Sequence, residues 1–82
     1  MNDEIGKVVD HQFDRVLGRQ VELQTRRTRD GYRSEWSFDG GDNWNCHLKV
    51  YSTSDEAMAK ARAGAFVNCV HQKVKVRRQA DD

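Results

Sequence analysis

The alternation of apolar and polar residues between positions 19 and 51 constrains the fold of this chain more than any other feature. Val21, Leu23 and Thr25 alternate with polar residues, and the same period of two returns from Tyr32 to Phe38. This is the period of a strand with one buried face. The dipeptide at positions 30–31, Asp-Gly, lies between the two segments and is typical of a two-residue hairpin turn. The pattern predicts an antiparallel hairpin.

The length of this turn sets the predicted register. A two-residue loop places Thr25 opposite Trp36 and Leu23 opposite Phe38, so that apolar residues meet. A five-residue loop over 39–43 then places Trp36 opposite Cys46 and makes residues 44–51 a third strand. Both turns give the same apolar face, which predicts a three-stranded antiparallel meander with Trp36 buried.

The two faces of the predicted sheet differ in polarity. One face is expected to be covered by helices, and it carries Val21, Leu23, Trp36, Phe38, Trp44, Cys46 and Leu48. The other is expected to be polar and open, and it carries Glu22, Gln24, Arg26, Arg33, Glu35, Ser37, Asn45, His47, Lys49 and Tyr51.

Two helices are predicted to flank the meander. Residues 3–17 place apolar side chains at helical spacing, and Gly18 is suited to end such a helix. Thr53 and Glu56 form a capping box that begins the second helix, which we expect to run to about residue 72. The predicted inner stripe of this second helix consists of Ala57, Met58, Ala61, Ala65, Phe66, Cys69 and Val70.

The predicted fold class is therefore α+β in the order α-β-β-β-α, with both helices packed on one face of the sheet. Residues 1–72 form one domain, and residues 73–82 form a tail that is basic and then acidic. Within this tail, apolar and basic residues alternate between positions 73 and 77. The alternation leaves three interpretations open: a short fourth strand, a frayed extension of the second helix or a disordered basic tail.

The order of elements and the alanines of the second helix carry a resemblance to a known family. Ala57, Ala61 and Ala65 are followed by Phe66. On these residues and on its topology, the segment from about residue 3 to residue 70 resembles the double-stranded-RNA-binding domain. The lysine-rich motif with which that family opens its second helix is replaced here by residues 54–58, Ser-Asp-Glu-Ala-Met.

Composition narrows the class of protein. The chain has 82 residues, the length of one domain, and its 14 Lys and Arg residues nearly balance its 13 Asp and Glu residues. A strongly basic nucleic-acid binder is therefore not expected, and an electrostatic partner would need a local patch. An apolar run of signal-peptide or membrane-span length is not found in the sequence, so we expect a cytoplasmic protein with reduced cysteines.

The chemistry-bearing residues favour neither a metal site nor an enzyme. Asp39, Asp42 and Asn43 lack the alternating acids and final Glu of a calcium loop, so we interpret 39–43 as a glycine turn. Cys46 and Cys69 are not paired with histidines at zinc-binding spacing. We also find no glycine loop of phosphate-binding spacing and no activated nucleophile. The sequence predicts no catalytic residue, no metal and no cofactor.

Two functional hypotheses follow from the sequence. The first is a small non-enzymatic binding or regulatory module, a monomer or homodimer, that contacts an unidentified protein through the open sheet face or an edge strand. The alternative is a nucleic-acid-binding domain that uses a basic hairpin and tail. The residues expected to contact either partner are Arg26, Arg27, Arg29, Arg33, Lys49, Lys73, Lys75, Arg77 and Arg78.

Overall fold

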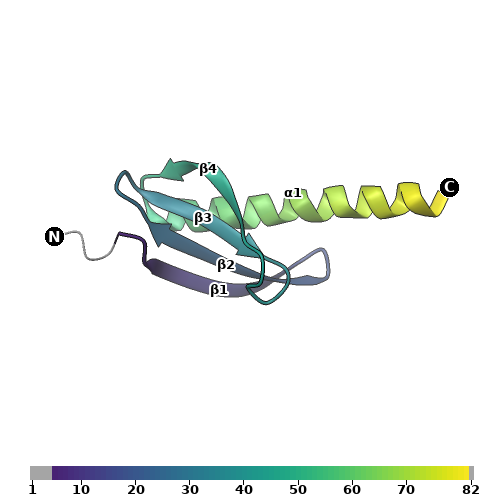
Figure 1. The fold of residues 1–82 in the computed structure, drawn as a ribbon, viewed down its shortest axis with the longest axis horizontal. Helices are drawn as coiled ribbons and strands as arrows, with labels where there is room; N and C mark the ends of the chain where they lie inside the picture. The colour runs from purple at the N-terminus through teal and green to yellow at the C-terminus, as the bar shows by residue number, and fades with distance from the viewer. Residues whose placement is uncertain (1–4, 82) are drawn as a thin grey trace.

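Four consecutive strands form one antiparallel sheet, and a long helix covers one of its faces (Figure 1). This computed structural model describes the backbone of residues 5–81 and the side chains of residues 5–71. The elements are β1 (Val8–Val16), β2 (Arg19–Arg27), β3 (Tyr32–Ser37), β4 (Asn45–Tyr51) and α1 (Ser54–Asp81). The strands lie in chain order, so β1 and β4 are the edges. The α+β class is confirmed, but the order is β-β-β-β-α.

The predicted first helix is wrong, because residues 8–16 form strand β1. Leu17 and Gly18 both have positive φ, at 51° and 82°, as a two-residue type I′ hairpin requires. Gly18 therefore turns the chain into β2 and does not end a helix. The apolar residues that suggested a helix do not form a core: Val8, Val9 and Phe13 are 40% or more exposed.

Strand β1 presents polar side chains to the helix. Arg62 of α1 donates from Nε to Asp14 Oδ2 over 2.7 Å and from Nη2 to Gln12 Oε1 over 3.2 Å. Val16 is the buried apolar residue of this strand. The strand is thus held by its pairing with β2 and by polar contacts to α1, which a helical period in the sequence does not reveal.

The β2–β3 connection is longer than predicted, but its effect on the sheet faces is small. Residues 28–31 form the loop, in which the Thr28 hydroxyl accepts a hydrogen bond from the Gly31 amide over 3.1 Å. Leu23 consequently pairs with Trp36, and Thr25 pairs with Ser34, so the predicted partners are wrong. The shift is two residues, and an even shift leaves each side chain on its predicted face.

The β3–β4 register differs from the prediction by an odd number, and this reverses the face of β4. Trp36 pairs with Asn45, and Glu35 pairs with Cys46. Cys46 therefore lies beside Glu35 on the open face and is exposed, so its predicted place in the core is wrong. An irregularity between Arg33 and Glu35 interrupts the pairing with β4. The predicted faces of other β4 residues are also wrong: His47 and Tyr51 approach α1, and Leu48 is fully exposed.

The core lies between α1 and the inner face of β2 and β3. Val21, Leu23 and Trp36 pack against a row of small residues on the helix. Trp36 is 4% exposed, which confirms its predicted burial. Gly64 allows this packing, because a Cβ at that position would lie 2.5 Å from the Trp36 ring. Small helix residues thus bring the helix backbone onto the indole.

Helix α1 begins as predicted and extends further than predicted. The Glu56 amide donates to the Thr53 hydroxyl over 3.1 Å, one half of the expected capping box. Residues 73–81 continue the helix beyond the end of the sheet, so a fourth C-terminal strand is wrong (Figure 1).

Because the order of elements is β-β-β-β-α, the topological resemblance to the double-stranded-RNA-binding domain does not hold. Among the described residues, no helix has the length and apolar character needed to cross a bilayer.

Candidate protein-contact surface on helix α1

Helix α1 is apolar on two opposite sides. One side, which includes Ala57, Ala61 and Ala65, is buried against the sheet. The other side faces solvent and carries five apolar residues, which we call the outer stripe: Ala59, Ala63, Phe66, Val67 and Val70. With 3.6 residues per turn, the centres of the two sides are roughly 170° apart. An amphipathic helix at a protein surface ordinarily has polar residues on its outer side.

The large side chains of the outer stripe are well exposed. The exposed fractions are 49% for Phe66, 50% for Val67 and 39% for Val70. The prediction that Phe66 and Val70 lie on the inner stripe is therefore wrong. Alanine and glycine bring the helix so close to the sheet that the sheet covers a narrow arc, and these bulkier residues lie outside it.

A groove between β4 and α1 adjoins the outer stripe. Its volume is about 450 Å³, and its lining residues are Trp36, His47, Tyr51, Lys60, Ala63, Gly64, Val67 and Asn68. Ala63 and Val67 belong to both the groove and the outer stripe. The two features thus form one continuous surface.

Aromatic and polar groups of the groove are held by specific contacts. Trp36 Nε1 donates to Asn68 Oδ1 over 2.8 Å, which fixes the indole under the helix. The His47 ring lies 4.9 Å from the Trp36 ring, centroid to centroid. His47 Nε2 lies 2.9 Å from the Lys60 carbonyl oxygen, to which it donates as the Nε2–H tautomer. The groove therefore has a fixed aromatic wall.

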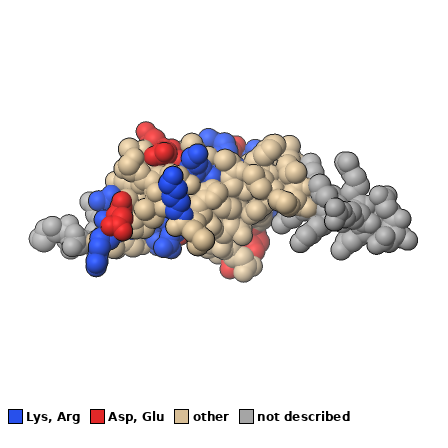
Figure 2. Space-filling view, turned by 90° about the horizontal axis from the view of Figure 1, so that it is seen from above, with Lys and Arg blue, Asp and Glu red and all other residues tan. Residues whose placement is uncertain are grey.

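Charged residues are scattered over the β4 side of the molecule. Figure 2 shows this side, on which residues other than Lys, Arg, Asp and Glu cover most of the described surface and basic and acidic residues adjoin one another at the left end. Because neither sign of charge dominates this side, it does not offer a single charged patch to a partner.

The predicted basic residues do not form one patch in the part of the chain whose side chains are described. Arg26 and Arg33 are opposite each other in the register of β2 and β3. Arg26 forms an ion pair with Glu35, with Nε 3.2 Å from Oε2. Arg27 stacks on Tyr32, with its guanidinium carbon 4.8 Å from the ring centroid. Two of the predicted arginines are thus engaged within the domain.

The remaining predicted contact residues lie at separate places. Arg29 is exposed at the β2–β3 loop, and Lys49 is exposed on β4, with its Nζ 5.8 Å from the Tyr51 ring centroid. The backbone of residues 73–78 belongs to α1. The side chains of Lys73, Lys75, Arg77 and Arg78 lie outside the described residues.

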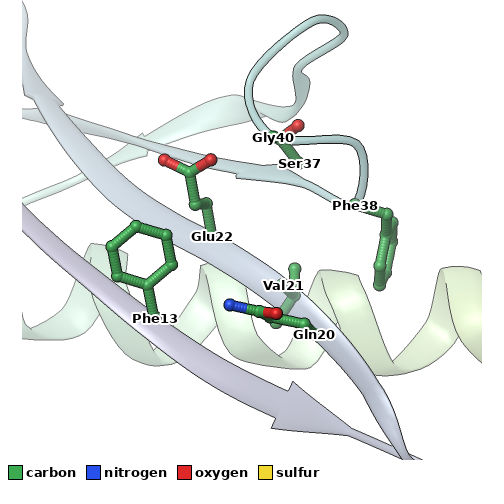
Figure 3. A pocket seen from close by; sticks show the side chains of 7 residues that line it. All are labelled: Phe13, Gln20, Val21, Glu22, Ser37, Phe38 and Gly40. Atoms are coloured by element: carbon green, nitrogen blue, oxygen red, sulfur yellow. The ribbon is translucent and has the colours of Figure 1, made fainter.

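A second and smaller hollow lies on the open face of the sheet. It has a volume of about 180 Å³, and Figure 3 shows Phe13 and Phe38 at its two sides with Glu22 and Gln20 between them. Glu22 Oε2 is 2.8 Å from His11 Nε2, so its carboxylate already has a partner. The Arg19 guanidinium lies 4.5 Å from the centroid of the Phe38 ring. The Glu22 carboxylate and the Arg19 guanidinium at this end of the sheet are therefore both in contact with other side chains of the domain.

The 39–43 segment is a turn closed by its own side chains. Asp39 Oδ1 accepts hydrogen bonds from the Ser37 hydroxyl over 2.8 Å and from the Asn43 amide over 2.9 Å. Asp39 Oδ2 accepts one from Asn43 Nδ2 over 2.7 Å. Hydrogen bonds from Asn43, reinforced by Ser37, lower the pKa of Asp39 to about 2. Both carboxylate oxygens are therefore used by the loop itself.

The described residues offer little for metal or covalent chemistry. Within residues 5–71, no group of three or more His, Cys, Asp or Glu side chains is placed to hold a metal ion. Cys69 is buried, with Sγ 3.6 Å from the Val16 carbonyl oxygen, and Cys46 is exposed on the opposite side of the sheet.

The outer stripe was missed because Phe66 and Val70 were assigned to the inner stripe, although each is nine residues, about 180° of helix rotation, from a buried alanine, Ala57 or Ala61. Ala59, Ala63, Phe66 and Val70 have the spacing 4, 3, 4, which is readable in the sequence.

Comparison with known protein families, with characterised proteins and with solved structures finds no significant match to this chain.

Proposed function

We propose that this domain is a non-enzymatic module that binds a protein through the outer stripe of α1 and the adjoining groove. The observation that carries the proposal is the apolar character of α1 on the side away from the sheet, with Phe66 and Val67 about half exposed. Contiguous apolar surface on a small domain marks interaction sites more often than isolated apolar residues do.

The groove supports the same function. Its Trp36 wall is fixed by Asn68, while Lys60 and Tyr51 stand beside apolar surface from Ala63 and Val67. Interfaces that bind tightly combine an apolar centre with a polar rim, and here the buried Trp36 and Tyr51 form the base of the groove while Val67 and Lys60 provide its accessible surface. Binding at this surface needs no rearrangement of the indole.

Nucleic-acid binding is less well supported by the geometry. Arg26 shares its charge with Glu35, and Arg27 is held against the Tyr32 ring, so these two arginines do not join the exposed Arg29 and Arg33 in one free patch. Phosphate contacts supply most of the affinity of nucleic-acid binders, and they require free basic charges.

The first experiment maps the contact surface in the cell that makes this protein. A photo-cross-linking amino acid replaces Val67 on the outer stripe, and a matched control places it at Leu48, which is fully exposed on β4. We expect protein cross-links from position 67 and few from position 48. Equal cross-linking from both positions would contradict the proposal, because contact would then follow exposure alone.

The second experiment tests the alternative function directly. Labelled single-stranded and duplex RNA and DNA are titrated with the full chain at about 50 mM salt, where phosphate-driven binding is strong. We expect no saturable binding. Binding that weakens steeply as salt rises, and that is lost in an Arg29→Ala, Arg33→Ala double variant, would favour nucleic acid over protein as the partner.

A further inference from the structure

We propose that the partner of the outer stripe is a second copy of this chain, bound through the same stripe in antiparallel orientation. The proposal rests on the proposed function, because it takes the outer stripe as the contact surface. It adds the identity, orientation and register of the occupant.

The spacing of the stripe fits a helix pair. Ala59, Ala63, Phe66 and Val70 follow one another at intervals of 4, 3 and 4 residues. Apolar residues alternating at 3 and 4 positions form the contact seam of two helices that cross at a small angle. The outer stripe thus supplies four consecutive seam positions on an exposed helix face.

Size complementarity selects an antiparallel partner of the same sequence. With the two-fold axis between positions 64 and 65, Ala59 of one copy faces Val70 of the other, and Ala63 faces Phe66. Each large side chain then meets an alanine, in four layers. A parallel pair would instead place Phe66 against Phe66 and alanine against alanine, which combines crowding with gaps.

The arrangement of the domain leaves room for this pairing. The outer stripe lies roughly 170° around α1 from the buried side, so two helices can pack back to back with the sheets outermost. Helix α1 also extends past the end of the sheet (Figure 1). At the seam positions the second copy would meet the helix and not a strand, because the sheet lies on the opposite side of α1.

Charge along the helix favours the same orientation. The first turn of α1 contains Asp55 and Glu56. By sequence, the segment 73–78 near its other end contains four basic residues and no acidic one. An antiparallel pair brings the acidic turn of each copy alongside the basic segment of the other, whereas a parallel pair would place like charges together.

The size of the contact predicts a weak dimer. From Ala59 to Val70 the seam is about 17 Å long at 1.5 Å per residue. This is shorter than the contact of a permanent dimer, so we expect a dissociation constant on the order of 1–100 µM.

The experiment is sedimentation equilibrium of the full chain over a concentration series that reaches about 1 mM, the weak end of the affinity scale. We expect a monomer–dimer equilibrium for the natural sequence. Phe66→Glu should weaken it about tenfold or more, because a charge enters two of the four layers. The matched control is Leu48→Glu, which places the same charge on another exposed apolar residue and should leave the equilibrium unchanged.

A mixing experiment tests the orientation and register. Ala63→Lys and Phe66→Glu should each weaken self-association, yet an equimolar mixture should form a heterodimer. In the antiparallel pair, the lysine of one copy faces the glutamate of the other, and the second Ala63–Phe66 layer stays natural. In a parallel pair the two substituted positions lie in neighbouring layers and do not face each other, so the recovery of affinity should be smaller there than in the antiparallel pair. Far-UV circular dichroism of each variant checks that the exposed positions tolerate the charge.

Each outcome decides a different point. A natural chain that remains monomeric to about 1 mM overturns the dimer proposal. A dimer that resists Phe66→Glu overturns the choice of surface, and a mixture that does not reassociate overturns the antiparallel register. If the chain is monomeric but position 67 still cross-links to another protein, the dimer fails while the proposed function stands.

Discussion

Replacement of Gly64 by alanine tests the closest packing in the domain. In the interior of an exposed helix this change ordinarily stabilises by about 1 kcal/mol, because alanine is the better helix former. Here the added Cβ would lie 2.5, 2.7 and 2.8 Å from three carbons of the Trp36 ring. Carbon atoms pack favourably at about 3.5–4.0 Å, so the helix and the indole must separate by about 1 Å.

The expected net effect follows from these opposing contributions. Overpacking of a well-filled core costs about 1–3 kcal/mol, and three short contacts to a rigid ring place Gly64→Ala at the upper end. After the gain in helix propensity is subtracted, the free energy of unfolding should fall by about 2 kcal/mol. Urea unfolding followed by far-UV circular dichroism at fixed protein concentration measures this. With a slope of roughly 1–2 kcal/mol per molar, the midpoint should fall by about 1–2 M.

A Trp36→Phe background supplies the control. Phenylalanine removes the far part of the indole, which is the part that approaches Gly64. In that background, Gly64→Ala should cost less or should stabilise, and the difference between backgrounds is the coupling energy of the two positions. If Gly64→Ala is as stable as the natural chain in the Trp36 background, a Cβ at position 64 does not clash with the indole, and the close packing of helix backbone on Trp36 is contradicted.

Three further predictions concern the core, the loop and the cysteines. Trp36→Ala should lower the free energy of unfolding by about 3–5 kcal/mol, while Arg33→Ala on the exposed surface should change it by less than about 0.5 kcal/mol; equal effects would contradict the core assignment. The folded pKa of Asp39, about 2, lies below the ordinary value of an aspartate. The contribution of Asp39 to stability is therefore present above about pH 4 and is lost as pH falls towards 2. A carboxyl-carbon NMR titration of Asp39 with a midpoint near 4 would refute this prediction. Cys46 should react with a thiol reagent in the folded protein, whereas Cys69 should react at the rate of unfolding; equally fast reaction of both would contradict the buried position of Cys69.

Local sequence patterns predicted several elements well. The alternation around Leu23 and Trp36 identified the two central strands and the burial of Trp36, although the loop between them is longer than expected. These predictions hold because an error of two residues in register leaves every side chain on the same face. The start of α1 was also predicted correctly, since a capping box depends on residues only three positions apart.

The remaining errors arise where distant segments decide between two local solutions. Val8, Val9 and Phe13 fit a helical period, but Leu17 and Gly18 turn this segment back to pair with β2 as a strand. The β3–β4 register differs from the prediction by one residue, which is enough to turn Cys46 outward. A strand's partners depend on loop length and on pairing with residues far away in sequence, and neither is encoded in the local period.

The sequence by itself determined the class of the domain, the inner faces of its two central strands and the start of its helix. Only the tertiary structure decided which apolar side of α1 the sheet would cover. Alanines and Gly64 admit the Trp36 ring on one side, so Phe66 and Val70, on the opposite side of the helix, remain in solvent. The physical reason is that a helix buries the side whose side chains fit the space between the helix and the sheet. The size of that space depends on the assembled sheet.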